Sequence, residues 1–433
     1  MNTASDRLVQ ALERYGIAYS SELQRELCLS QATVSRLLKA AGGRIYRLGK
    51  GRNSRYSLLH PLFTPQPLYR INPAGIPEQL AEIAPLVQWR YAIDAAHHQR
   101  WLTGLDDSGL FDDLPNFLDD LRPQGFLGRQ IARQLGASFP ADPRHWRATQ
   151  VWAYLLEFGA DMPGDLVLGE RALAAANHPP EETPVDNYPA LAERVLSGLL
   201  TTSSAGGEQP KFTTYTANGH VMVKFSPRGH NPEASRWRDI LIAEQLAGDV
   251  LREAGLATAT SRLHEREGRL FLEVQRFERQ DATGRRPMIS LTAIDAEFSG
   301  IGHDWPSTLR RLLGMKLVND ADLQTALFAH LFGQWIGNTD MHLGNLSFHP
   351  TETTFRLLPL YDMAPMRWAP VRGELPQSVN LPLPVRDPRD EVSWFKSGTL
   401  AMEFWGRLSE ARRLSSAFRQ IAEQARCMVS NSL

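Results

Sequence analysis

The chain has 433 residues, of which 42% are hydrophobic and 22% charged, a composition typical of a folded globular protein and not of a disordered one. This length exceeds what one ordinary core fills, so two or three domains are expected. The net charge of −1 hides an asymmetry, because residues 1–60 hold ten Lys and Arg against four Asp and Glu. A basic terminal segment on a mildly acidic remainder favours a polyanion-binding module attached to a larger body.

The cysteines and the N-terminus indicate the compartment. Cys28 and Cys427 lie at opposite ends of the chain and match no metal-ligand spacing, which favours a reducing environment. The N-terminal segment is polar and helical in pattern, unlike a signal peptide. No apolar run approaches the roughly 18 residues that a membrane span needs. We therefore expect a cytoplasmic protein with no membrane partner.

The first 40 residues predict three short helices. Apolar residues recur at helical spacing from Leu8 to Leu12, and Tyr15 with Gly16 ends the first helix. A second helix is predicted at "SELQREL" and a third at "QATVSRLLKAAG", which Ser30 can cap. Two short helices joined by a brief turn form the helix-turn-helix pattern.

The third predicted helix presents polar side chains opposite its apolar face, as a helix in the major groove of DNA does. The segment "RIYRLGKGRNSRYSLL" then predicts two strands around a basic, Gly-rich tip, like the wing of a winged helix. Pattern and charge favour DNA binding over the alternative of a three-helix interaction module with a solvated hairpin. The predicted DNA-contacting residues are Gln31, Thr33, Ser35, Arg36, Lys39, Lys50, Arg52 and Arg55.

The middle of the chain carries fewer functional signals. Its start is Pro-rich, which predicts an extended linker at residues 61–78. Residues 79–190 mix strand-like apolar runs with a helical stretch and an acidic segment whose carboxylates we expect on a solvated face. A second linker is predicted at 177–184, "NHPPEETP".

Two lysines follow in settings that suit an anion. Lys211 ends the small-residue loop "TTSSAGGEQPK", whose backbone N–H groups can face a phosphate, although the loop lacks the Walker A spacing. Lys224 lies in the predicted strand "GHVMVKFSP", where a buried Lys needs a negative partner. The alternative is an edge-strand Lys that faces water.

A long predicted helix, "PEASRWRDILIAEQLAGDVLREAG", comes next and contains Glu233 and Glu244. The segment "ATSRLHEREGRLFLEVQRFER" then predicts a hairpin of two strands. A Gly-rich loop, a strand Lys, a helix with Glu and further antiparallel strands reproduce the order of elements in the N-terminal lobe of a protein kinase.

The segment "IGNTDMHLGNLSFH" places Asn345 five residues after Asp340, which is the separation of the catalytic Asp and the magnesium-binding Asn in protein kinases. Asp362, in "LYDMAP", follows 17 residues after Asn345 and adds a further hard oxygen ligand suited to Mg²⁺. The alternatives are a turn acid, a cap and an Asx turn, respectively. The order of the elements and the matching spacing favour a kinase-type site.

Residues from about 80 to 430 resemble the HipA-like Ser/Thr kinases, the toxin half of bacterial toxin–antitoxin pairs. The resemblance rests on "SAGGEQPK", "VMVKFS", "LEVQRFER", "GNTDMHLGNLSF" and "LYDMAP", in that order. It implies an α+β fold in which a winged helix-turn-helix precedes a two-lobed, protein-kinase-like body. The implied domains are the winged helix at 1–60, the linker at 61–78, an N-terminal kinase lobe at 79–290 and a largely α-helical C-terminal lobe at 291–433.

The resemblance also implies roles for single residues. Asp340 corresponds to the catalytic base, Asn345 and Asp362 to the metal ligands, and Ser204 to the inhibitory autophosphorylation site, with Ser203 beside it. The family loop usually reads Gly-Ala-Gln, whereas Glu208 here places an acid beside the phosphates. The implied ATP-binding residues are Gly206, Gly207, Lys211, Lys224 and His342.

The expected function is that of a HipA-like toxin. It would use ATP and Mg²⁺ to phosphorylate itself and a protein substrate, which the family resemblance associates with translation, and would inhibit growth unless restrained. DNA and a HipB-like antitoxin are the expected partners. Two alternatives stay open: a DNA-binding regulator with a vestigial kinase fold, and a toxin that cleaves DNA with Mg²⁺ at the same Asp and Asn residues.

Overall fold

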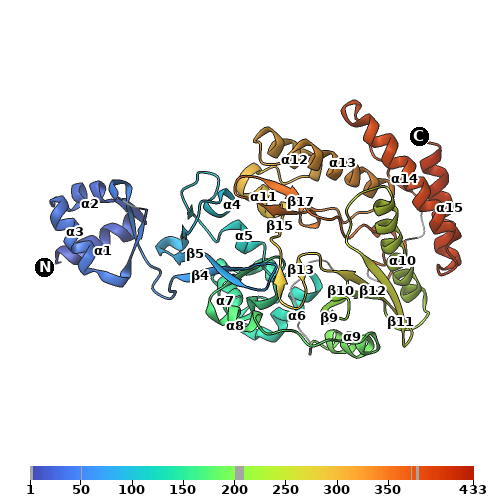
Figure 1. The fold of residues 1–433 in the computed structure, drawn as a ribbon, viewed down its shortest axis with the longest axis horizontal. Coiled ribbons are helices and arrows are strands. Elements are labelled where there is room, and N and C mark those ends of the chain that lie inside the picture. The colour runs from blue at the N-terminus through green and yellow to red at the C-terminus, as the bar shows by residue number, and fades with distance from the viewer. Residues whose placement is uncertain (1–2, 50, 200–208, 372, 377–379) are drawn as a thin grey trace.

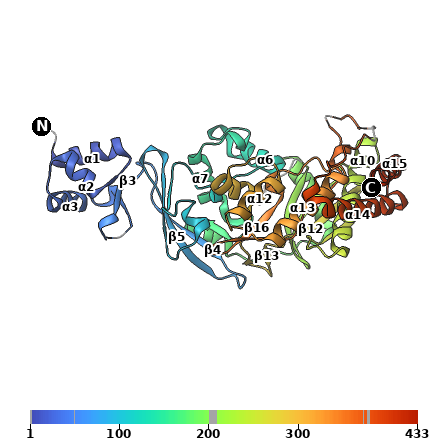
Figure 2. The same cartoon turned by 90° about the horizontal axis from the view of Figure 1, so that it is seen from above.

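The computed structural model shows an elongated molecule with its two termini at opposite ends (Figures 1 and 2). A small N-terminal module lies at one end, and two long C-terminal helices lie at the other. None of the helices in the described part of the chain is both long and apolar enough to cross a membrane. The residues that the structure describes are 3–49, 51–199, 209–371, 373–376 and 380–433.

The N-terminal module contains the helices and the hairpin that its sequence predicts. The side chains of Thr3 and Ser30 cap the first and third helices by accepting hydrogen bonds from the backbone N–H groups of Asp6 and Thr33, at 3.2 and 3.3 Å. Apolar side chains from all three helices form a separate small core. The strands form an antiparallel sheet in the order β1-β3-β2. The elements are α1 (Ala4–Tyr15), β1 (Ile17–Tyr19), α2 (Ser20–Leu27), α3 (Gln31–Ala40), β2 (Ile45–Leu48) and β3 (Arg55–Leu58).

The N-terminal module docks directly on the next sheet, and the prediction of a linker at 61–78 is wrong. That segment holds β4 (Gln66–Ile71) and the start of β5 (Pro77–Pro85). Its prolines did not exclude strands, because a strand tolerates proline at its first residue, where Pro77 lies. Across the junction, Gln88 donates a hydrogen bond to the carbonyl of Glu13 at 2.8 Å.

Residues 66–176, hereafter the middle domain, form a sheet of their own in the order β7-β6-β5-β4-β8. The pairing of β4 with β8 closes this unit, so the expected single lobe over 79–290 is divided in two. Asp120, expected on a solvated face, is half-buried and accepts a 2.9 Å hydrogen bond from the N–H of Ser290. The remaining elements are β6 (Tyr91–Ala95), α4 (Arg100–Thr103), β7 (Leu110–Phe111), α5 (Asn116–Asp119), α6 (Gly125–Leu135), α7 (Ala148–Phe158), β8 (Leu166–Leu168) and α8 (Glu170–Ala176).

A second, four-stranded antiparallel sheet follows, in the order β11-β12-β10-β9. The long helix α10 packs on it and begins where the sequence predicts: Asn231 caps it by accepting from the N–H of Ala234 at 2.8 Å, and Pro232 occupies its first turn. The predicted hairpin is present as β11 and β12. The elements are α9 (Tyr188–Leu196), β9 (Lys211–Thr216), β10 (Gly219–Phe225), α10 (Pro232–Glu253), β11 (Ser261–Arg266), β12 (Arg269–Gln275), β13 (Arg279–Gln280) and β14 (Gly284–Arg285).

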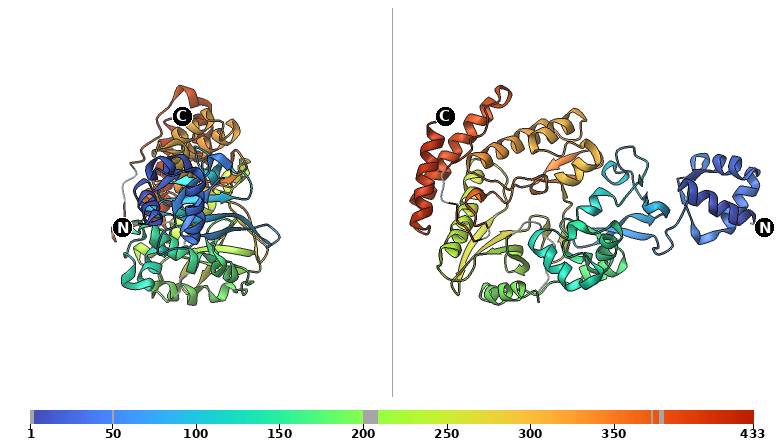
Figure 3. Two further views of the ribbon diagram at one scale, coloured as in Figure 1. Left: turned by 90° about the vertical axis from the view of Figure 1, so that its left-hand side faces the viewer. Right: turned by 180° about the vertical axis from the view of Figure 1, so that it is seen from behind.

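The last part of the chain, from residue 291, is mainly helical and faces the two sheets (Figure 3). A short sheet in the order β15-β16-β17 lies at its base. One continuous apolar core runs through the middle domain, the four-stranded sheet and these helices. The elements are β15 (Ile289–Ser290), α11 (Leu291–Ile294), α12 (Trp305–Gly314), α13 (Asp320–Trp335), β16 (Ser347–Pro350), β17 (Phe355–Leu357), α14 (Glu391–Glu410) and α15 (Ser416–Ser430).

Candidate active site

Two neighbouring strands bring Lys211 and Lys224 together. Lys211 is the first residue of β9, and its partner across the antiparallel pair is Lys224 on β10. Cross-strand partners lie on the same face of a sheet, so both ammonium groups occupy one side of it. Only 2% of Lys211 and 4% of Lys224 is exposed. Two adjacent buried cations require anions close by.

Lys224 receives two such anions. Its Nζ lies 2.5 Å from Glu244 Oε1 on α10 and 2.5 Å from Asp362 Oδ1, on the far side of the site. Burial alone lowers the pKa of Lys224, but the carboxylates of Asp362 and Glu244 raise it by more, so the net shift is upward. Lys224 therefore stays charged and ties helix α10 to the sheet. Sequence reasoning placed Glu244 on this helix without giving it a role.

The net pKa shift of Lys211 is opposite in direction to that of Lys224. Burial lowers its pKa to about 8, and the charge of Lys224 acts in the same direction, while Asp362 and Glu244 only partly offset both. The charged form of Lys211 is thus less favoured than that of Lys224. A polyanion placed next to it would favour the charged form.

The turn after α13 is organised by Asn338, which is buried. Its Oδ1 accepts a hydrogen bond from the backbone N–H of Asp340 at 3.0 Å, and its Nδ2 donates to the backbone carbonyl of Asp362 at 3.2 Å. One amide side chain thereby fixes the two acidic loops against each other. Sequence reasoning did not assign Asn338, although an Asn two residues before Asp340 has the spacing of an Asx turn.

Asp340 and Asn345 lie on this same turn. The side chain of Asp340 is 47% exposed, and His342 Nε2 lies 3.8 Å from its Oδ1. Partial burial is the main cause that raises the pKa of Asp340. Asn345 donates through Nδ2 to the backbone carbonyl of Asp340 at 2.5 Å, which leaves its Oδ1 as an acceptor. The turn therefore presents one carboxylate and one amide oxygen.

Asp362 comes after β17 with a backbone φ of 57°, in the left-handed region that a residue other than Gly seldom occupies. Such conformations persist where surrounding contacts enforce them, often at functional sites. The neighbouring Tyr361 hydroxyl lies 2.6 Å from Ser347 Oγ and donates to the Gly344 carbonyl at 3.1 Å. Burial raises the pKa of Asp362, but Lys224 and Lys211 lower it by more, so this carboxylate is ionised.

Comparison with known proteins assigns two regions of the chain to families. Residues 62–177 match the family described as "YjjJ-like toxin, middle domain", and residues 203–429 match the "HipA-like C-terminal domain". The chain is also 36% identical to Toxin YjjJ of Escherichia coli (strain K12) over 441 residues, which cover 98% of this chain and 96% of that protein. The chain belongs to the HipA-like toxin family.

A solved structure of the HipA-like family shares the fold. It is Shewanella oneidensis MR-1 HipA, solved with HipB and its operator DNA, and it matches with a TM-score of 0.57 at 15% identity. The match covers 84% of this chain and 95% of that one. Every residue of the lysine and carboxylate site lies within the HipA-like C-terminal match, whereas the N-terminal module lies outside both family matches.

The structure describes some of the predicted ATP-site residues of this HipA-like chain and leaves others outside the described residues. It brings Lys211, Lys224, Asp340 and Asp362 together: Lys224 bonds Asp362, and the charges of both lysines act on the pKa of Asp340. His342 accepts a 3.0 Å hydrogen bond from Gly344 N through Nδ1, and its ring lies beside Asp340. The predicted residues that lie outside the described residues are Ser203, Ser204, Gly206, Gly207 and Glu208.

The predicted DNA-contacting residues also divide. Gln31, Ser35, Arg36 and Lys39 are exposed along α3, and Thr33 is half-buried. Arg55 instead donates to the carbonyl of Ser108 at 3.1 Å, so it contacts the middle domain. Lys50 and the side chain of Arg52 lie outside the described residues.

Proposed function

We propose that the chain is a HipA-like toxin that acts as an ATP- and Mg²⁺-dependent protein Ser/Thr kinase. The observation that carries the proposal is Lys224 Nζ between Glu244 and Asp362, at 2.5 Å from each, with Asp340 and Asn345 on the adjoining turn. A strand Lys paired with a helix Glu, a metal-binding Asp, and an Asp and Asn five residues apart are the parts of a protein-kinase site.

The donor set fits Mg²⁺, which prefers hard oxygen ligands. Asp362 contributes an ionised carboxylate, and Asn345 contributes the amide oxygen that its hydrogen bond to the Asp340 carbonyl leaves available. Bound there with ATP, Mg²⁺ would neutralise charge on the phosphate oxygens. Lys224 and Lys211 bind those oxygens from the sheet side. Both lysines are held in place before ATP arrives, so little reorganisation accompanies the reaction.

Asp340 acts as the base. As the substrate hydroxyl oxygen forms its bond to the γ-phosphorus, the bond from that phosphorus to the bridging oxygen of ADP breaks, and the hydroxyl proton passes to the Asp340 carboxylate. Its raised pKa strengthens it as a base, and its exposure lets a protein substrate reach it. Asn338 holds the turn that presents it.

Phosphoryl transfer from radiolabelled ATP tests the proposal. Asp340→Ala is expected to lower autophosphorylation by at least about 10²-fold, since the base is removed. Asp320→Ala, an exposed acid on α13, the helix before the same turn, is the matched control and keeps its activity. Undiminished transfer by Asp340→Ala contradicts the proposal. Cleavage of plasmid DNA that needs Asp340 but no ATP would instead support the DNA-cleaving alternative.

We also propose that the N-terminal module binds DNA with α3. Its exposed Gln31, Ser35, Arg36 and Lys39 side chains and the local excess of basic residues support this. The Shewanella HipA structure contains HipB and operator DNA. We therefore propose a HipB-like antitoxin as a partner of this chain. The proposed DNA-binding module is part of the toxin chain itself.

We further propose, from the family resemblance, that autophosphorylation at Ser204 regulates the kinase. A phosphate on that serine, seven residues before Lys211, adds about −1.5 to −2 charge. It would compete with the phosphates of ATP for Lys211 and so inactivate the kinase. Mass spectrometry should find phosphate on Ser204 or Ser203 in the active protein and in no sample of Asp340→Ala. Phosphate on neither serine in the active protein contradicts this switch.

A further inference from the structure

A cavity of about 710 Å³ lies between the middle domain and the four-stranded sheet. Tyr154 and Phe158 of α7 line one side, and Tyr215 of β9 and His220 of β10 line the other. Its volume is that of a small-molecule site. None of the five charged residues of the candidate active site is in its lining. The cavity is therefore separate from the site where ATP is proposed to bind.

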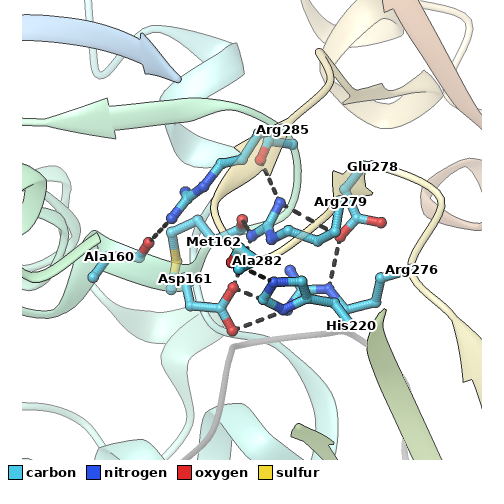
Figure 4. Close-up of polar contacts among 10 residues, drawn as sticks. Ala160, Asp161, Met162, His220, Arg276, Glu278, Arg279, Ala282 and Arg285 are labelled. Atoms are coloured by element: carbon cyan, nitrogen blue, oxygen red, sulfur yellow. Dashed lines mark hydrogen bonds and ion pairs between the residues drawn. The ribbon is translucent and has the colours of Figure 1, made fainter. Parts of the chain in front are cut away.

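Three buried arginines form one wall of the cavity, and we call Arg276, Arg279 and Arg285 the arginine wall (Figure 4). Asp161 approaches it from the middle domain: both of its oxygens accept from Arg276 Nη1 at 2.9 Å, and Oδ1 accepts from Arg279 Nη2 at 2.7 Å. Glu278 accepts from Arg276 Nε at 2.8 Å. Two carboxylates thus face three guanidinium groups.

Of the three arginines, Arg285 is the one without a carboxylate partner among the described residues. Its Nη2 donates to the Ala160 carbonyl at 2.5 Å, and its Nη1 has no hydrogen-bond partner within the described residues. Burial and the repulsion of Arg279 lower its pKa to about 9. The next acid in the middle domain, Asp165, already pairs with Arg70 at 3.0 Å. A buried cation without a carboxylate partner is unfavourable unless an anion comes to it.

Arg276 offers the second donor. Its Nε and Nη1 are used by Glu278 and Asp161, and its third nitrogen, Nη2, makes no hydrogen bond among the described residues. Guanidinium groups bind carboxylate and phosphate oxygens in a fork geometry. The arginine wall therefore presents unused N–H groups of the kind that recognise an oxyanion.

The other walls suit a flat apolar group. The rings of Tyr154 and Phe158 stack with centroids 5.8 Å apart, and those of Tyr215 and His220 lie 4.9 Å apart. Aromatic side chains bind flat rings by stacking or edge contacts. An acid in the lining, Glu157, is engaged by Arg171, whose side chain is 74% exposed.

We propose that this cavity binds a small ligand in which an oxyanion, a carboxylate or a phosphate, is attached to a flat ring. The oxyanion meets Arg276 and Arg285, and the ring lies against the aromatic walls. Strand β9 borders both sites, because it starts with Lys211 and continues through Thr213, Thr214 and Tyr215 in the cavity lining. A bound ligand thus contacts the strand that carries a lysine of the candidate active site.

Calorimetric titration of the full chain with phenyl phosphate and with benzoate tests the proposal. At least one probe should bind saturably at one site per chain, and the tighter one identifies the oxyanion. Ala175 is exposed on α8 and lines the cavity, so Ala175→Trp fills the space without touching the arginine wall. Both Ala175→Trp, which occupies the space of the ligand, and Arg285→Gln, which removes a charge-assisted hydrogen bond to it, should bind the probe about tenfold more weakly or worse. Arg228→Gln, at an exposed ion pair with Glu267 outside the lining, should bind as the wild type does.

Ala175→Trp decides the outcome if Arg285→Gln does not fold. Undiminished binding by Ala175→Trp overturns the proposal, and so does the absence of saturable binding of both probes to the wild type. Lys224→Met separates the two sites: it should retain probe binding, and loss of binding would place the probe at the candidate active site and reject this cavity.

Discussion

Two buried ionic clusters in this chain are built from different cations. The candidate active site uses lysines with Glu244 and Asp362, whereas the contact between the middle domain and the four-stranded sheet uses arginines with Asp161 and Glu278. Lysine is a compact charge whose pKa moves readily on burial, while arginine stays charged and binds several oxygens at once. The lysines thus lie where ATP is proposed to bind, and the arginines lie where two regions of the chain are held together.

The two clusters should differ most in how strongly a substitution lowers phosphoryl transfer. Asp362→Asn should lower phosphoryl transfer by at least on the order of 10³-fold, because several kcal/mol of transition-state stabilisation depend on the metal it would hold. Its stability should also fall, because the buried Lys224 loses one of its two carboxylates, although it keeps Glu244 as a partner. Radiolabel transfer and urea unfolding of one preparation measure both quantities. Full activity of this variant would remove Asp362 from the proposed mechanism.

The arginine cluster should affect stability alone. Asp161→Asn should lower the free energy of unfolding by about 1–3 kcal/mol, less than the loss from a fully buried ion pair, because the Asp161 side chain is 43% exposed. The activity per folded molecule should be retained. Glu267→Gln, in an ion pair with Arg228 whose side chains are both 61% exposed, is the control and should change stability by less than about 1 kcal/mol.

The pH dependence of the stability of the same variant tests the direction of the Asp161 pKa shift. Burial raises the pKa of Asp161, but Arg276 and Arg279 lower it by more, so its native pKa is below the ordinary value. The stabilisation is therefore complete above the ordinary Asp pKa of about 4 and is lost as the pH falls towards the native value. Urea midpoints should fall less steeply in acid for Asp161→Asn than for the wild type, and equal slopes would contradict the assignment.

Lys211 should be a stability liability. Its native pKa of about 8 lies below the ordinary 10.5, so at pH 7 the folded chain holds a buried charge that destabilises it by about 3 kcal/mol. Lys211→Met should stabilise the fold by up to this amount at pH 7 and abolish phosphoryl transfer. The wild type should gain stability as the pH rises from about 8 to 10.5, and the variant should lack that gain. Identical profiles in urea would refute the shift.

The smallest effect is expected at the exposed basic surface, where no buried cluster exists. Arg36→Ala on α3 should weaken DNA binding and reduce the slope of log affinity against log salt by about 1, the contribution of one cationic side chain bound to a phosphate. Arg171→Ala, on the middle domain, should leave the slope unchanged. Fluorescence anisotropy over a salt series measures it, and an unchanged slope for Arg36→Ala would remove this residue from the interface.

Local signals in the sequence predicted much of this molecule. Ser30 caps the third helix as expected, α10 begins at Pro232 as predicted, and the predicted strand around Lys224 is present as β10. Asp340 and Asn345, whose spacing suggested a kinase-type site, lie on one turn, where Asn345 donates to the Asp340 carbonyl at 2.5 Å. These signals depend on residues close together in the chain, and such patterns are readable without a structure.

Long-range pairing could not be read in the same way. Arg276 and Asp161 are 115 residues apart, and nothing local to either indicates the other. The strand β4 was taken for a linker because its prolines were weighed above its apolar residues Leu68 and Ile71, which are buried through pairing with strands on both sides. Glu244 was one of several acids on a long helix, and only the fold selects it as the partner of Lys224.

The contacts of the arginine wall bear on whether the two matched regions can fold independently. The two matched regions, 62–177 and 203–429, are separate as families, yet Arg279 and Arg285 on one side donate to the carbonyls of Gly164, Met162 and Ala160 on the other. The apolar core is also continuous across that boundary. Neither region is therefore a self-sufficient fragment. A chain cut within 177–184 should remain a single particle, and its two pieces should separate only on denaturation.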